Sequence, residues 1–106
     1  MHEEQRGLRF SFNAPAEVIA ENSAVGIPAR VTELSLRGCR LEMSGSTEER
    51  QHLQLKVFHS GETFESAATV IYVSPAGVGL MFGGMRADSR ALLQKWILAE
   101  LDKQST

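Results

Sequence analysis

Two short stretches of the chain bring together residue types that can hold an anionic ligand. The first is QRGLRF near the N-terminus, where Arg6 and Arg9 stand on either side of Gly7, directly before a run of alternating residues. Guanidinium groups bind phosphate oxygens through paired hydrogen bonds, bind the O6/N7 edge of guanine and stack on purine rings. An arginine pair on an arm loosened by glycine can therefore fold over such a ligand. The plainer alternative is a disordered basic terminus.

The second stretch is ELSLRG, where Glu33 and Ser35 precede Gly38. Within a strand, side chains two residues apart point to the same face, so Glu33 and Ser35 are predicted to lie together. A carboxylate there can accept hydrogen bonds from guanine, while glycine permits positive φ or the close approach of a ligand. Arg37 and Arg40 lie nearby and are predicted at the surface, Arg40 pointing outward beside the site. The alternative is a solvated strand end with a bulge.

The elements that must position these residues are mostly strands. Apolar and polar residues alternate over most of the first eighty positions, and turn residues interrupt them. The pattern predicts six strands, over residues 10–20, 29–34, 39–43, 53–57, 64–73 and 78–82. Short strands at this spacing indicate a closed antiparallel barrel. Gly77 and Gly79 are predicted to serve in a turn and in barrel packing.

The period changes after the sixth strand. Apolar residues then recur at helical spacing: Leu92, Leu93, Trp96, Ile97 and Leu101. This pattern predicts a helix over residues 86–103, which Asp88 or Ser89 caps and whose apolar stripe, with Trp96 in the core, packs on the barrel. We expect a single domain over residues 1–106, with a flexible arm over 1–9 and the barrel over 10–83.

Composition and charge favour one soluble domain and a small ligand. The chain has 106 residues, 42% hydrophobic and 23% charged, which suits a single core. Its net charge of −2 opposes binding to a nucleic-acid polymer, since such binders carry a basic excess. The chain has no apolar run near the roughly 18 residues of a membrane helix, and its N-terminal residues are too polar for a signal peptide. We therefore expect a cytoplasmic protein that is not embedded in a membrane.

The spacing of reactive residues gives no support for metal or catalytic chemistry. His2, His52 and His59 are not spaced as metal ligands with one another or with Cys39. The sequence has no evident nucleophile–base pair or cofactor loop, so we expect neither an enzyme nor a cofactor. Cys39 alternates with Leu41 and is predicted to be a small buried hydrophobe; as the single cysteine it cannot form an internal disulfide.

The order of these features resembles the PilZ domain, the bacterial receptor module for cyclic di-GMP. Members of that family carry an RxxxR arm, a strand, the motif D/N-x-S-x-x-G and a six-stranded barrel closed by a C-terminal helix. The resemblance covers essentially the whole chain, including the ending GVGLMFGGMRADSRALLQKWI. It implies an all-β fold with one C-terminal α-helix, a six-stranded antiparallel PilZ-type β-barrel, and cyclic di-GMP as the ligand.

The resemblance also implies which residues bind that ligand. In ELSLRG, Glu33 takes the Asp or Asn position, while Ser35 and Gly38 take the serine and glycine positions. Arg9 takes the position of the second arginine of the arm, and strict spacing puts Gln5 at the first. The ligand-binding residues expected are Gln5, Arg6, Arg9, Glu33, Ser35, Gly38 and Arg40.

Two departures from the family pattern leave two functions open. Gln5 removes a charged phosphate partner, and each charged hydrogen bond is worth roughly 1.5–3 kcal/mol. Arg6, one residue off register, can replace that charge if the loop around Gly7 shifts. Glu33 keeps the carboxylate acceptor of the family position but adds a methylene.

Two functions therefore stay open. The first function is a cyclic di-GMP receptor that changes conformation and acts on an unidentified partner protein. The second is a PilZ-like adaptor that has lost the nucleotide and works by protein–protein contact.

Overall fold

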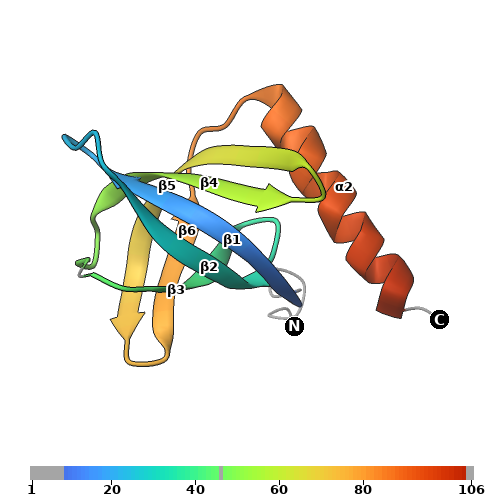
Figure 1. Ribbon diagram of the computed structural model, residues 1–106. Coiled ribbons are helices and arrows are strands. Elements are labelled where there is room, and N and C mark those ends of the chain that lie inside the picture. Colours follow the sequence, from blue (N-terminus) through green and yellow to red (C-terminus); the bar gives the residue numbers. More distant parts are fainter. Residues whose placement is uncertain (1–8, 46, 105–106) are drawn as a thin grey trace.

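The computed structural model describes residues 9–45 and 47–104, and Figure 1 shows how they are arranged. Six antiparallel strands form a closed barrel, and one helix lies against it. The elements are β1 (Phe10–Ala20), β2 (Gly26–Leu34), β3 (Gly38–Met43), β4 (His52–His59), β5 (Glu62–Ser74), β6 (Gly77–Phe82) and α2 (Ala87–Gln104). Their order around the barrel is β1-β2-β3-β6-β5-β4. The predicted all-β fold with one C-terminal helix is confirmed.

The strands run further than their sequence patterns indicate. β2 begins at Gly26 instead of residue 29, because Val18 and Ile19 of β1 pair with Ile27 and Gly26. β5 likewise extends at both ends, since tight hairpins join it to β4 and to β6. Backbone pairing therefore continues into segments whose side chains do not alternate clearly.

The inward-facing residues of the strands form one core. Val31, Leu41, Leu55, Val57 and Phe64 have no exposed surface. Full burial of an apolar side chain of this size contributes about 1.5–3 kcal/mol, so the predicted alternation supplies most of the driving force for closing the barrel. The residues between them face outward and remain available for a surface site.

Two bulges decide which side chains reach the outer surface near the β2–β3 turn. β2 carries one extra residue opposite β3 between Val31 and Glu33, and β5 carries one extra residue opposite β6 between Val70 and Tyr72. An extra residue interrupts the alternation and turns the next side chain to the other face. Val31 and Leu34 are consequently both buried, although strict alternation would put them on opposite faces. The bulges place Glu33 and Tyr72 on the outside of the barrel.

The helix α2 packs where the start of β1 meets the β4–β5 hairpin, and its inner face is apolar. Trp96 is buried there. Its indole ring stacks on Phe12, with ring centroids 5.6 Å apart, and meets the ring of His59 edge-on at 5.1 Å. On the outside, the ammonium of Lys95 donates to both carboxylate oxygens of Glu62 at 3.1 Å. The prediction that Trp96 belongs to the core is confirmed.

Two details of α2 differ from the sequence prediction. The helix starts at Ala87, so neither Asp88 nor Ser89 is its N-cap; Asp88 lies in the first turn, where its carboxylate accepts from the Ser89 N–H at 2.9 Å. A carboxylate in the first turn still stabilises the helix by its interaction with the macrodipole. Leu101 is 39% exposed, because the C-terminal end of α2 extends beyond the barrel (Figure 1).

Candidate functional site

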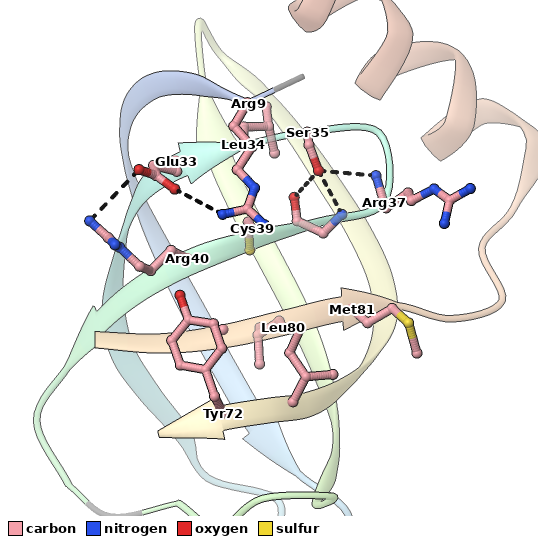
Figure 2. A pocket seen from close by; sticks show the side chains of 13 residues that line it. Arg9, Glu33, Leu34, Ser35, Arg37, Cys39, Arg40, Tyr72, Leu80 and Met81 are labelled. Atoms are coloured by element: carbon pink, nitrogen blue, oxygen red, sulfur yellow. Dashed lines mark hydrogen bonds and ion pairs between the residues drawn. The ribbon is translucent and has the colours of Figure 1, made fainter. Parts of the chain in front are cut away.

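A groove of about 490 Å³ opens on the outer surface of the barrel, beside the turn that joins β2 to β3. One side of the groove carries Arg9 and polar residues of β2, the turn and β3. The other side carries Tyr72 of β5 and Met81 of β6 (Figure 2). Ile71 of β5 also lines the groove. The groove therefore combines a charged side with an aliphatic and aromatic side, as a site for a ligand with both charges and rings requires.

The carboxylate of Glu33 lies between two arginines at the charged side of the groove. Its Oε2 is 3.8 Å from Nη2 of Arg40, and its Oε1 is 4.0 Å from Nη1 of Arg9 (Figure 2). The strand register produces this arrangement, because Glu33 pairs with Arg40 on β3 and with Ser11 at the start of β1. Residues far apart in the chain thus meet at one point.

The groove is positively charged, although the chain as a whole carries −2. Three arginines and one glutamate line it, an excess of two positive charges: Arg9, Arg37, Arg40 and Glu33. The side chain of Arg9 is 66% exposed, so its guanidinium can turn toward a ligand without breaking a packed contact. A local cluster of this sign attracts anions against the net charge of the protein.

Ser35 closes the turn between β2 and β3. Its hydroxyl accepts from the backbone N–H groups of Arg37 at 3.2 Å and Gly38 at 3.1 Å, and donates to the Gly38 carbonyl at 3.2 Å (Figure 2). The Ser35 N–H also donates to that carbonyl, at 2.9 Å. Because β2 ends at Leu34, Ser35 belongs to this turn and does not share the strand face of Glu33. The serine therefore holds the shape of the turn beside the groove.

Gly38 is required by the packing of β3 against β6. A Cβ at this position would overlap the carbonyl oxygen of Leu80 and lie 3.2 Å from the Cα of Met81. The backbone of Gly38 does not have positive φ, so the first reason that the sequence suggested for a glycine here does not apply. A glycine is needed at position 38 because the backbone of β6 approaches it closely.

The aliphatic stem of Arg40 runs beside Gly77. A Cβ on Gly77 would lie 2.7 Å from the carbonyl oxygen of Leu41 and at ordinary contact distance, 3.4 Å, from Cγ of Arg40. The Nε atom of Arg40 is buried and has no hydrogen-bond partner within residues 9–45 and 47–104. Its guanidinium nevertheless points toward Glu33, at the open side of the groove (Figure 2).

The structure brings five of the expected residues to one groove: Arg9, Glu33, Ser35, Gly38 and Arg40. Gln5 and Arg6 lie outside the described residues. The sequence prediction missed Ile71, Tyr72 and Met81, which complete the groove from the other side. Only the register of β5 against β6 could have pointed to them, since no motif links them to the β2–β3 turn.

Cys39 takes no part in this surface chemistry. Its side chain is buried, and burial raises the pKa of the thiol from 9.0 to about 12. A thiol with so high a pKa is not a thiolate at neutral pH, so it is not a nucleophile there. The predicted role of a small buried hydrophobe is confirmed.

The described part of the chain contains no group of three or more His, Cys, Asp or Glu side chains that could hold a metal ion. It also contains no helix long and apolar enough to cross a membrane.

The fold and the groove define a small barrel domain with an anion-attracting outer surface. Comparison with known proteins shows which family this domain belongs to. The family model of the PilZ domain matches residues 3–99, which includes both arginine-containing stretches. This chain belongs to the PilZ domain family, a family of cyclic di-GMP receptor domains that are generally not enzymes. None of the curated proteins compared with the chain matches it.

A solved structure with a similar fold is the PilZ domain of CeSA from a cellulose-synthesising bacterium. The two share 13% of their residues and superpose with a TM-score of 0.72, over 88% of this chain and 97% of that chain. At this level of identity the likeness shows the fold alone.

Proposed function

We propose that this protein is a receptor for cyclic di-GMP and that the ligand binds in the groove beside the β2–β3 turn. The observation that carries the proposal is the meeting of Arg9, Glu33 and Arg40 around one point of the groove. Two guanidinium groups there suit the phosphates of a cyclic dinucleotide, and a carboxylate suits the N1–H and N2–H donors of guanine.

The geometry supports a change in pairing when the ligand binds. Both ion pairs of Glu33 are long and partly exposed, so each contributes about 0–1 kcal/mol. A phosphate that accepts paired hydrogen bonds from a guanidinium binds more strongly than this. The ligand phosphates therefore replace Glu33 as the partners of Arg9 and Arg40. The Glu33 carboxylate then becomes free to accept hydrogen bonds from a base.

We propose that Gln5 and Arg6, which precede Arg9 in the chain and lie outside the described residues, also contact the ligand. Arg9 lines the groove and leads directly to them, and Gln5 is four positions away, within about 13 Å for an extended chain. Arg6 is nearer still and supplies the charge that Gln5 lacks. Binding of the ligand at this surface of the barrel changes what a partner protein meets there, and this change transmits the signal.

Calorimetric titration with cyclic di-GMP tests the proposal. We expect a dissociation constant at or below the low micromolar range, and loss of binding in Arg9→Ala. Arg90→Ala is the matched control, because Arg90 is exposed on α2 and does not line the groove. Absence of both heat and thermal stabilisation at about 100 μM ligand would overturn the proposal, since ligand binding stabilises by mass action. The ligand-free adaptor would then be the function to pursue, through its protein partners.

A further inference from the structure

We infer that Tyr72 is a further specificity-determining residue of the groove, a flat platform on which one purine base of the ligand stacks. This inference rests on the proposed function, because it assigns a place for a base within the same groove. Four observations on β5, β6 and β3 support it.

The first observation is that a bulge turns Tyr72 outward. Val70 of β5 pairs with Leu80 of β6, and both are buried in the core. Strict alternation would place Tyr72 on the same inner face as Val70. The extra residue, Ile71, shifts the register so that Tyr72 pairs with Gly79 and faces the groove. Bulges commonly re-aim a side chain in this way beside functional sites.

The second observation is that Gly79 makes room for the ring. A Cβ on Gly79 would overlap Cδ2, Cε2 and Cζ of Tyr72, so the ring lies directly on the β6 backbone. Figure 2 shows the ring face-on where it lies across that strand. A ring supported on one face is held in a single orientation and presents its other face to the groove. Holding the platform in advance lowers the cost of binding a second ring.

The third observation is the row of residues that continues from the ring. Gly79 pairs with Arg40 on the other side of β6, and Arg40 pairs with Glu33 on β2. Neighbouring strands are about 4.8 Å apart, so the ring over Gly79 on β6 lies one strand away from Arg40 on β3. The hydroxyl end of Tyr72 is directed toward Arg40 (Figure 2). A base stacked on Tyr72 can therefore present its edge to Arg40 or Glu33.

The fourth observation concerns exposure and composition. Tyr72 is half-buried, and the side chains around it in the groove, Ile71 and Met81, are 51% and 50% exposed. An apolar side next to three arginines suits a ligand that carries both rings and negative charges. A purine base has the shape and the π face to cover that side, and base–aromatic stacking contributes strongly to nucleic-acid recognition.

An alternative account is that the ring only covers Gly79, as aromatic residues do in many sheets. Substitutions at this position separate the two accounts. Tyr72→Leu keeps an apolar cover on the glycine but removes the π face, whereas Tyr72→Phe keeps both and removes only the hydroxyl. Phe58→Leu is a matched control, because Phe58 is an exposed aromatic residue on β4 outside the groove.

The experiment is a titration of the full chain and these variants with cyclic di-GMP, together with the aromatic resonances of tyrosine. We expect Tyr72→Leu to weaken binding about tenfold or more, by the usual contribution of one stacked base. Tyr72→Phe and Phe58→Leu should change it by about twofold or less. Tyr72 is the single tyrosine of the chain, so an upfield shift of its ring resonances on ligand addition in the unaltered protein, caused by the ring current of the base, reports stacking.

The possible results distinguish failure of this inference from failure of the receptor function. Binding by the unaltered protein without a shift of the Tyr72 resonances, and with undiminished affinity in Tyr72→Leu, would overturn this inference while leaving the receptor function in place. Failure of the unaltered protein to bind would overturn the receptor function and the inference with it. If Tyr72→Leu does not fold, the Tyr72 resonances of the unaltered protein still give the answer.

Discussion

The carboxylate of Glu33 lies 3.8 Å from the guanidinium of Arg40, on facing positions of β2 and β3. The bulge in β2 makes this contact possible, because without it Glu33 would face the interior with Val31. The same carboxylate reaches Arg9 at 4.0 Å. In the protein without ligand, Glu33 therefore forms weak ion pairs with both arginines, at the point where we propose that the phosphates of the ligand bind.

Shortening this side chain should strengthen binding. Glu33→Asp keeps the acceptor but withdraws the carboxylate by one methylene, so Arg9 and Arg40 are released for the ligand. We expect cyclic di-GMP to bind about threefold to tenfold more tightly, in line with the free energy of one or two partly exposed ion pairs. Calorimetry on Glu33→Asp, with Glu65→Asp on the outer face of β5 as the control, measures this. Weaker binding by Glu33→Asp would show that the longer side chain is needed.

The turn depends on the hydroxyl of Ser35. Ser35→Ala removes three hydrogen bonds in a buried place and leaves two backbone N–H groups without this acceptor, so we expect a loss of about 1–3 kcal/mol in the free energy of unfolding. Ser74→Ala is the matched control, because Ser74 makes a similar turn with the Ala76 N–H and the Gly77 carbonyl but is exposed. Urea denaturation of both variants gives the comparison. Equal losses would mean that burial of the turn is not what makes Ser35 important.

Gly38 should not tolerate a side chain. In Gly38→Ala the new methyl group meets the Leu80 carbonyl, and β3 must move away from β6. We expect the free energy of unfolding to fall by about 1–3 kcal/mol or more, as for other overpacked positions. Gly84→Ala is the control, since a Cβ there meets nothing within 4 Å. A guanidinium chloride midpoint for Gly38→Ala equal to that of Gly84→Ala would contradict the packing argument.

Burial of Cys39 should make stability depend on alkaline pH. The pKa of the thiol is about 12 in the folded protein and 9.0 when exposed, so folding favours the neutral form. This contribution is fully present below pH 9 and is lost as the pH rises from 9 toward 12. We expect the unaltered protein to lose more stability over that range than Cys39→Ala, measured by denaturation at several pH values. The folded protein should also resist alkylation at pH 8, and fast modification there would refute the burial of the thiol.

Much of the fold could be predicted because its signals are local. The alternation in β1, with Phe10, Phe12 and Val18 inward, depends only on neighbouring residues along one strand. The change of period before Leu93 and Trp96 marks the helix in the same way. The local pattern did not predict the ends of the elements correctly. Gly26 begins β2 because β1 pairs with it, and Leu101 is exposed because the helix extends beyond the barrel.

The candidate site likewise combines features that local sequence predicts with features that depend on tertiary structure. The sequence by itself determined the residue types that face an anionic ligand, since Arg9, Glu33 and Arg40 stand in recognisable stretches next to predicted strands. Only the tertiary structure decided that Glu33 lies between the two arginines, that Ser35 closes a turn, and that Tyr72 lies across Gly79. The physical reason is register: one extra residue in β2 or β5 turns a side chain from the core to the surface, and pairing across several strands sets where that residue falls.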